Sequence, residues 1–198
     1  MVLGLTQKVV NQLIENGTIR EEDKELYIYG LKQGLIIILN ILTTIGIGFI
    51  FGMVWQSILF MVTYIPLRTY AGGFHAKKQI NCYLFSIAIT VIMLLVIKFI
   101  PQTDFIILGI ALIAGSLILI LAPIEDANKP LDKTEILVFR KRTRIIFGIQ
   151  MSIIILLLFS GQKNISMCMS FSNFLLGCML LLGKLKNYIS YKILLTKS

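Results

Sequence analysis

The fold of this chain is decided by the run LIIILNILTTIGIGFIFGM at residues 35–53, which contains no charged side chain. A second uncharged part, FIILGIALIAGSLILILAPI, occupies residues 105–124. At about 1.5 Å per residue in a helix, each run is long enough to span a hydrocarbon core of about 30 Å. The sequence therefore predicts an all-α integral membrane protein.

The composition supports this prediction and argues against a soluble nucleic-acid-binding protein. Hydrophobic residues make up 57% of the chain and the mean hydropathy is +0.85, whereas soluble domains are about 45–50% apolar. The net charge of +9 comes from basic residues scattered between apolar runs, without the interleaved aromatics of a nucleic-acid-binding face. Lipid headgroups explain these charges better, and the whole chain, 1–198, is expected to form a single membrane domain.

The number of spans follows from the lengths of the apolar stretches. Residues 33–67 would form a helix about 52 Å long, which is too long for one crossing. Gly46, Gly48 and Gly52 offer places to turn, so two spans are expected here, the second being short and tilted or partly re-entrant. The prediction is six transmembrane helices, near residues 33–51, 53–67, 83–100, 104–124, 144–160 and 165–183.

The N-terminal segment, residues 1–28, is polar and acidic, so no cleavable signal peptide is expected there. Within it Val2, Leu5, Val9 and Leu13 recur at nearly helical spacing before the Asn16-Gly17 break. This pattern predicts an amphipathic helix that lies at the membrane surface or against the bundle.

The distribution of basic residues predicts the orientation of the chain in the membrane. With the N-terminus in the cytoplasm, all of the 19 Lys and Arg residues except Lys98 and Lys163 fall on the cytoplasmic side. Such a bias is the usual determinant of orientation. Both termini, the segment 68–82 and a basic loop at 125–143 are therefore expected to be cytoplasmic.

One polar constellation stands out, RTYAGGFHAKKQINC at residues 68–82, between the second and third predicted spans. It contains His75, the only histidine of the chain, and Cys82 seven residues later. An imidazole can take the proton of a thiol and later protonate a leaving amine. The pair is therefore a candidate for nucleophilic catalysis.

Geometry restricts how this pair could meet. On an unbroken helix the spacing separates the two Cα atoms by about 10.5 Å, so the chain must bend, and Gly72-Gly73 permits a bend. Arg68, Lys77 and Lys78 would add a positive field that favours a thiolate and could hold an oxyanion or a carboxylate. The alternative is an interfacial histidine and a cysteine that only packs.

No second histidine or nearby carboxylate completes a zinc site, and Cys168 and Cys178 are too far apart on a helix to form a disulfide.

The segment 68–82 resembles the signature of the accessory gene regulator B (AgrB) family of membrane cysteine peptidases. APIEDANKPL, residues 122–131, is similar to the cytoplasmic loop after the fourth span of that family. The resemblance implies that His75 and Cys82 are catalytic and that Arg68 and Gly73 are required for activity. It also implies an AgrD-like propeptide as substrate, the precursor of a quorum-sensing pheromone, and a homodimer without a cofactor.

The reaction that the resemblance implies begins with cleavage of the C-terminal tail of the propeptide at the cytoplasmic face. The acyl-enzyme thioester then passes its acyl group to a side chain of the same peptide, which closes a thiolactone or lactone ring. The third catalytic residue is left open among Gln79, Asn81, Glu125 and Asp126. Side chains expected to contact the substrate are Lys77, Lys78, Glu125 and Lys129, with the cluster at 140–144 as a further possibility.

Two other classes of function remain open at this point. A small transporter or peptide-export subunit would need charged side chains along a path through the membrane, and Lys98 is the one candidate. A membrane scaffold without enzymatic activity would need neither His75 nor Cys82. Replacement of Cys82 separates both from a peptidase.

Overall fold

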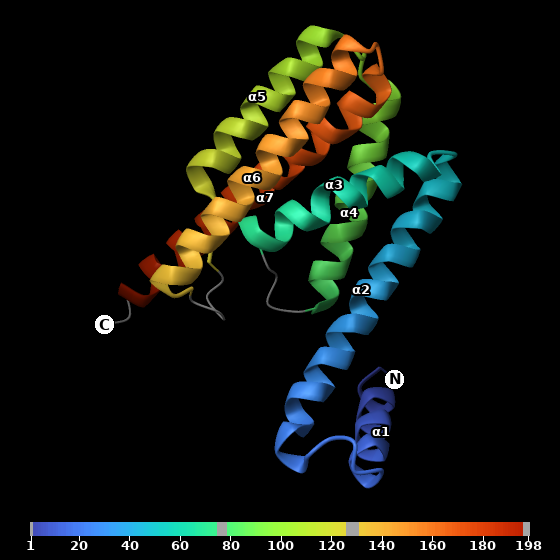
Figure 1. Cartoon of the computed structure of the whole chain (residues 1–198), viewed down its shortest axis with the longest axis vertical. Coiled ribbons are helices and arrows are strands. Elements are labelled where there is room, and N and C mark those ends of the chain that lie inside the picture. The colour runs from blue at the N-terminus through green and yellow to red at the C-terminus, as the bar shows by residue number, and fades with distance from the viewer. Residues whose placement is uncertain (1, 75–78, 126–130, 196–198) are drawn as a thin grey trace. The chain divides into compact units, whose positions relative to one another are not determined.

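The computed structural model describes residues 2–74, 79–125 and 131–195, which are almost entirely helical (Figure 1). The helices, in chain order, are α1 (Val2–Glu15), α2 (Lys24–Phe51), α3 (Val54–Ala71), α4 (Gln79–Phe99), α5 (Asp104–Leu121), α6 (Lys133–Phe159) and α7 (Lys163–Leu195), with a 3-10 helix, η1 (Glu21–Asp23), before α2. Within these ranges the only β-type pairing is an isolated bridge between Gly72 and Ile124. The predicted all-α class is confirmed.

The long helices agree closely with the predicted spans. Five segments are long and apolar enough to cross a membrane, namely Glu21–Phe51, Ile80–Phe99, Asp104–Leu121, Lys133–Phe159 and Lys163–Ile189. The remaining predicted span, 53–67, corresponds to α3, which has 18 residues and contains Pro66 and Arg68. α3 is not among those five segments, in keeping with the expectation of a short second span.

The chain divides into two compact units, residues 1–44 and 45–198. In the first unit α1 is the predicted amphipathic helix, but its buried side is not the predicted stripe, because Thr6 and Val10 are buried whereas Val9 is exposed. It ends at the predicted break, where the Thr18 N–H donates to the Leu13 carbonyl at 3.0 Å. This hydrogen bond is typical of a helix that ends at a glycine.

The second unit begins with the last turns of α2 and the turn into α3. The Met53 N–H donates to the Gly48 carbonyl at 2.7 Å, which closes the turn around Gly52. A Cβ atom on Gly48 would lie 2.5 Å from the Ser57 Oγ. The predicted turn between the first two spans is thus present, and Gly48 allows the two helices to approach closely.

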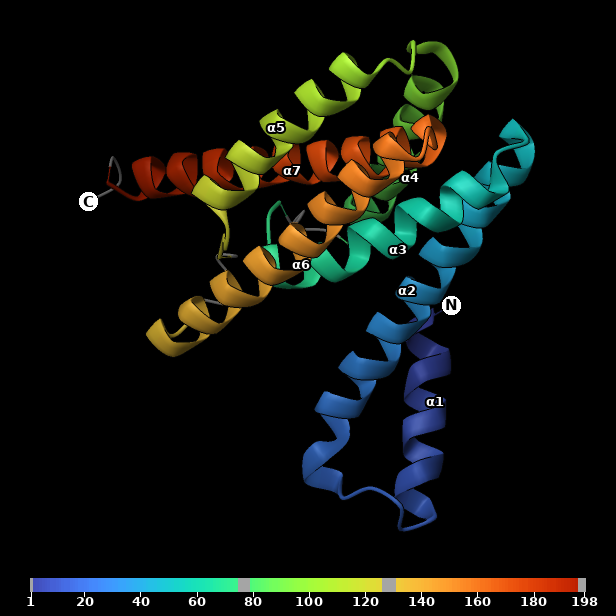
Figure 2. The ribbon, with the colours of Figure 1, turned by 45° about the horizontal axis from the view of Figure 1, so that its top comes forward.

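The central helix of the second unit is α7, which α3, α4, α5 and α6 all contact. α3 lies across α6 and α7 (Figures 1 and 2). At the start of α7 the Lys163 ammonium pairs with the Asp104 carboxylate at 3.1 Å, which ties α7 to the start of α5. α7 is the helix around which the other four are arranged.

A polar layer crosses the interior of this unit. The Thr63 hydroxyl of α3 donates to the Ser172 Oγ of α7 at 3.1 Å, and the Gln150 amide of α6 donates to the Thr63 carbonyl at 2.9 Å. All three side chains are buried. Hydrogen bonds between helices in a membrane contribute about 0.6 kcal/mol each on average. This layer therefore joins α3, α6 and α7 by specific contacts rather than by apolar packing alone.

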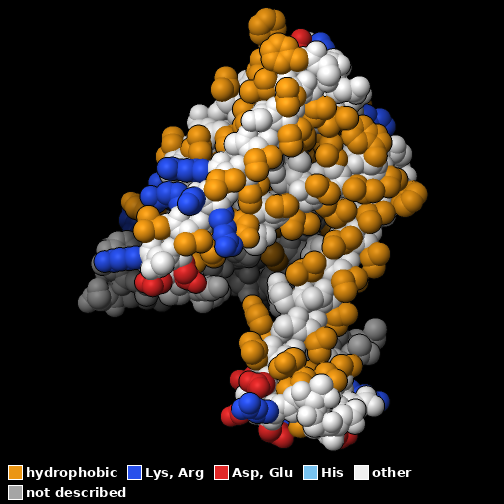
Figure 3. All heavy atoms as spheres, in the orientation of Figure 1, with side chains coloured by type: hydrophobic (Ala, Val, Ile, Leu, Met, Phe, Trp, Pro, Cys, Tyr) orange, Lys and Arg blue, Asp and Glu red, His pale blue; other side chains and the backbone are white. Residues whose placement is uncertain are grey.

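α6 begins before the membrane span that was predicted at 144–160. Its first turn carries a capping box in which the Asp132 backbone N–H donates to the Glu135 carboxylate at 3.1 Å. Such a box satisfies the free N–H groups of a helix start. The second half of the expected basic loop, 125–143, is therefore helical, while residues 126–130 lie outside the described residues. Basic side chains gather over this part of α6 (Figure 3).

Candidate functional site

The structure describes three of the four residues that the sequence singled out as most important. Arg68 lies in the last turn of α3, and Cys82 lies in the first turn of α4. Gly73 lies in the segment that joins α3 to α4, which we call the link and of which residues 72–74 are described. His75 falls outside the described residues. The same holds for the expected substrate contacts Lys77, Lys78 and Lys129, and for Asp126 among the candidate orienting residues.

Arg68 is half-buried and binds the backbone of the link. Its guanidinium donates through Nη1 to the Gly72 carbonyl and through Nη2 to the Phe74 carbonyl. Hydrogen bonds from a charged donor are stronger than those between neutral groups. These two hydrogen bonds tie the Arg68 side chain to the link and hold its shape.

The backbone conformation and close contacts at positions 72 and 73 of the link require glycine at both. Their φ angles are 73° and 121°, which residues with a side chain rarely adopt. A Cβ on Gly73 would lie 2.0 Å from the Arg68 Nη1, and a Cβ on Gly72 would lie 2.2 Å from the Ile124 carbonyl oxygen. The roles of Arg68 and Gly73 are thus physically linked, since the space that Gly73 leaves empty is filled by the guanidinium.

The segment after α5 forms the second support of the link. The Ile124 N–H donates to the Ala71 carbonyl at 3.0 Å, beside the bridge between Gly72 and Ile124. The carbonyl of Glu125 accepts a hydrogen bond from the Asn187 amide of α7 at 2.8 Å. The part of the motif before residue 126 is therefore packed against the end of α3, although sequence analysis treated the two segments separately.

α7 forms the third support, which sequence analysis missed. The Phe74 N–H donates to the Met179 carbonyl at 3.0 Å. A Cβ on Gly183 would lie 2.8 Å from the Gly73 carbonyl carbon and 2.9 Å from the Phe74 nitrogen. The Lys186 ammonium lies 5.5 Å from the centre of the Phe74 ring, within the range of a cation–π contact. In the sequence, the glycine at position 183 was the one sign that α7 packs closely against the link.

The Phe74 ring also contacts α4. Its centre lies 5.1 Å from that of Phe85, which follows Cys82 by one helical turn. Cys82 shares a helix stripe with Ser86, Ile89 and Met93, spaced by three and four residues. Met93 is fully buried, and Ile89 packs against the same core. Cys82 is the exposed end of this stripe, because the core that covers Ile89 and Met93 does not reach it.

The other cysteines of the chain are free thiols in α7. Cys168 is buried, with its thiol 3.5 Å from the Gln56 carbonyl, and Cys178 is half-buried. No disulfide connects them, as their spacing predicted. Among the described residues, which leave out His75, no group of three or more His, Cys, Asp or Glu side chains lies close enough to hold a metal ion.

α6 contacts the end of α3 next to the link. The Arg142 guanidinium donates to the Tyr70 hydroxyl at 3.2 Å and lies 5.1 Å from the centre of its ring. Phe139 packs edge-on against the same ring at 5.9 Å. These contacts fix the helical extension of α6 to α3 on the exposed surface.

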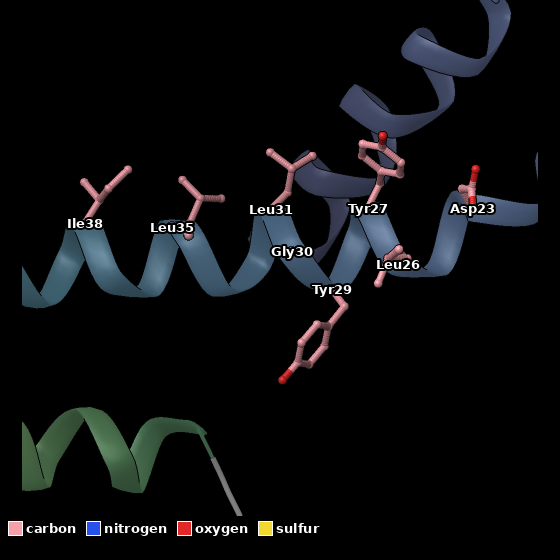
Figure 4. A pocket seen from close by; sticks show the side chains of 9 residues that line it. Asp23, Leu26, Tyr27, Tyr29, Gly30, Leu31, Leu35 and Ile38 are labelled. Carbon is pink, nitrogen blue, oxygen red and sulfur yellow. The ribbon is translucent and has the colours of Figure 1, made fainter. Parts of the chain in front are cut away.

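A groove of about 680 Å³ is present in the first unit, and none of the site residues described above lines it. Tyr27, Leu31, Leu35 and Ile38 line it from one side of α2 (Figure 4). Apart from Asp23 its lining carries no carboxylate, thiol or imidazole, so it offers no group for nucleophilic catalysis.

The fold and the site together define a helical membrane protein with an exposed thiol next to a glycine link that an arginine holds. The sequence model described as Accessory gene regulator B matches residues 6–181, and the chain belongs to this family. No solved structure matches the chain.

Several curated proteins named AgrB-like are similar to this chain. One from Listeria welshimeri serovar 6b is 30% identical over 130 residues, which cover 64% of this chain and 63% of the relative. One from Clostridium perfringens strain 13 is 25% identical over 142 residues, which cover 68% of this chain and 66% of the relative. The matched part is less than two thirds of the length of either relative.

Proposed function

We propose that this chain is a membrane cysteine endopeptidase that removes the C-terminal tail of an AgrD-like pheromone propeptide and promotes closure of a thiolactone or lactone ring. Membership of the accessory gene regulator B family supports a role in that system. The observation that carries the proposal is the contact of Phe74 with Phe85. It brings the backbone that leads into His75 to the first turns of α4, where Cys82 is exposed.

In this mechanism His75 takes the proton of the Cys82 thiol, and the thiolate attacks the scissile carbonyl. The tail leaves as an amine after His75 returns the proton, and the acyl group stays on Cys82 as a thioester. A thiol or hydroxyl of the same peptide then attacks the thioester, which closes the ring and frees Cys82. Arg68 and Gly73 act as positioning residues, because they set the path of the link before His75.

We further propose the cytoplasmic side as the location of this chemistry, with both termini on that side and two copies of the chain in the functional assembly. The bias of basic residues supports the orientation. With the link between α3 and α4 on the cytoplasmic side, Cys82 in the first turn of α4 lies at the edge of the membrane, where an amphipathic peptide would bind.

The described residues favour a peptidase over a transporter. Their buried polar side chains are Thr, Ser, Gln and Asn, and none of those is charged. Lys98, the candidate intramembrane charge, is exposed and lies 5.9 Å from the centre of the Phe99 ring near the end of α4. A coupled transporter generally places charged side chains inside the bundle, and among the described residues no Asp, Glu, Lys or Arg side chain is buried.

Replacement of Cys82 by Ala tests the proposed function. Membranes that contain the wild-type chain and the short propeptide encoded by the neighbouring reading frame are expected to give the cleaved product and an acyl adduct on Cys82, both measured by mass spectrometry. Cys82→Ala is expected to abolish both while insertion into the membrane stays normal. Cys178→Ala is the matched control and is expected to retain cleavage. Normal cleavage by Cys82→Ala would exclude the peptidase mechanism.

A further inference from the structure

Tyr64 of α3 is a polar side chain to which neither the sequence motif nor the mechanism above gives a role. Its ring stacks on Phe60 with centres 5.1 Å apart and planes 29° apart. It packs against two core clusters, one around Met93 and Leu94 and the other around Leu67 and Leu180. The ring is therefore held on several sides.

The position of Tyr64 on α3 turns it towards the candidate site. It precedes Arg68 by four residues, so the two side chains lie on one face of the helix, one turn apart. Arg68 in turn binds the Gly72 and Phe74 carbonyls. Tyr64 thus lies on the side of α3 that faces the link between α3 and α4.

The stripe of α4 that carries Cys82 leads to the same place. Phe60 belongs to the core cluster that contains Met93, and Ile89 packs against this cluster one turn nearer to Cys82. Because α3 ends and α4 begins at the same link, the step from Phe60 to Tyr64 along α3 leads towards Cys82 on α4. Arg68, on the same face of α3 as Tyr64, donates to the Phe74 carbonyl, and the Phe74 ring contacts Phe85, one helical turn after Cys82.

We propose that the Tyr64 hydroxyl donates a hydrogen bond to the oxyanion that forms when Cys82 attacks the scissile carbonyl, and that Tyr64 is thus a further catalytic residue. This proposal rests on the peptidase function proposed above. A cysteine peptidase needs a fixed donor at this point, since the developing charge must be stabilised. Arg68 already donates to the Gly72 and Phe74 carbonyls and thereby holds the link.

The electrons and protons of this step balance without another reactant. The sulfur–carbon bond forms, the π electrons of the carbonyl move to its oxygen, and the oxyanion accepts a hydrogen bond from the phenol. Phenols are protonated at neutral pH, so Tyr64 keeps its proton throughout. When the carbonyl re-forms, the carbon–nitrogen bond breaks and the amine takes the proton that His75 carries. The positive charge of Arg68 polarises the phenol O–H and strengthens its donation.

The test compares two reactions of Cys82, of which only one passes through an oxyanion. Acetylation by p-nitrophenyl acetate forms a tetrahedral oxyanion, whereas alkylation by iodoacetamide is a displacement that forms none. Both products are mapped to Cys82 by mass spectrometry of the full chain in membranes. Tyr64→Phe is expected to slow acetylation by about 100-fold, the usual effect of removing one oxyanion donor, while the rate of alkylation stays the same.

Tyr70→Phe is the matched control, since it removes a hydroxyl from the same helix where that group contacts only the surface residue Arg142. It is expected to leave both rates unchanged. Unchanged acetylation in Tyr64→Phe would overturn the proposal. An equal fall in both rates would also overturn it, because the hydroxyl would then act on the thiolate itself. The unaltered alkylation rate shows in the same samples that the variant is folded.

Failure of the underlying function gives a different result. If Cys82→Ala still processes the propeptide, the peptidase mechanism is excluded whatever Tyr64→Phe does to the acetylation of Cys82. If Cys82→Ala abolishes processing and Tyr64→Phe leaves both processing and acetylation unchanged, the peptidase mechanism stands and the role of Tyr64 is excluded.

Discussion

α5 and α7 pack against each other more extensively than any other pair of the described helices, yet they differ in polarity and in how much of each helix is buried. α5 is almost purely apolar, and 28% of its span is buried. α7 carries Ser166, Ser170, Ser172 and Asn173 in one buried run, and 72% of its span is buried. In lipid the apolar side chains face outward, so the more polar helix can be the more buried one.

The buried stripe of α5 shows how the two helices come close. Its buried residues are Ile107, Ala111, Ala114, Gly115 and Ile118. Small residues at an interface let helix backbones approach. Gly177 of α7 allows the approach to α5, since a Cβ there would lie 3.0 Å from Leu117, whereas Gly115 of α5 faces α6, since a Cβ there would lie 3.0 Å from Phe147. α7 contacts the link directly, through Met179 and Gly183, whereas α5 is joined to it only through Ile124 in the segment that follows the helix. We therefore expect changes in α7 to affect activity and changes in α5 to affect stability.

The largest effect is expected for Gly183→Ala in α7. The new Cβ would lie 2.8 Å and 2.9 Å from backbone atoms of Gly73 and Phe74, which cannot move aside as a side chain can. A displacement of about 1 Å near a reacting group can lower the rate about 100-fold. Propeptide cleavage in membranes measures this loss. The matched control is Gly109→Ala in α5, where a Cβ meets no atom within 4 Å, and equal activity of both variants would contradict the close packing of α7 on the link.

A stability effect is expected for Ile118→Ala in α5. Ile118 has 0% exposure and lies in the core cluster with Phe147 and Leu180. Removal of a buried isoleucine side chain costs about 2–5 kcal/mol, measured as the free energy of unfolding in mixed micelles. Ile120→Ala on the same helix serves as the control, because Ile120 is 78% exposed. A loss as large for Ile120→Ala would show that the assigned face of α5 is wrong.

The smallest effect is expected for Ser172→Ala in α7. It removes one hydrogen bond with Thr63, while the Thr63 hydroxyl keeps the Leu59 carbonyl as an acceptor at 2.7 Å. The expected loss in unfolding free energy is about 0.6 kcal/mol. Ser116→Ala in α5 is matched to it, since the exposed Ser116 bonds only within its own helix. A difference of zero between the two variants would mean that the polar layer does not stabilise the bundle.

The helices could be predicted from the sequence because the thickness of the bilayer limits their length. The uncharged run that ends near Gly52 gives the end of α2, and the one that begins at Phe105 gives the start of α5. The start of α6 at Lys133 was not predicted, because an exposed basic segment gives no length signal. Its capping box at Asp132 and Glu135 was the local sign of that start.

The site could be predicted only in part, for a different reason. The spacing of Arg68, Gly73 and Cys82 is local and can be read from the sequence. The contacts that hold the link join residues far apart in the chain, such as Phe74 with Met179 and Ala71 with Ile124. One apolar helix does not reveal which neighbour it packs against. The engagement of Arg68 with backbone carbonyls, and the position of Tyr64, therefore required the structure.

The unequal exposure of the three thiols has a consequence for the design of inhibitors. Cys82 is exposed, whereas Cys168 is buried and Cys178 is half-buried. Under the proposed function, a covalent inhibitor with a weakly reactive, lipid-soluble warhead would reach Cys82 before the other two thiols by access alone. With Cys82 at the edge of the membrane as proposed, the design of such a compound would depend on the depth of its warhead in the bilayer rather than on a deep pocket.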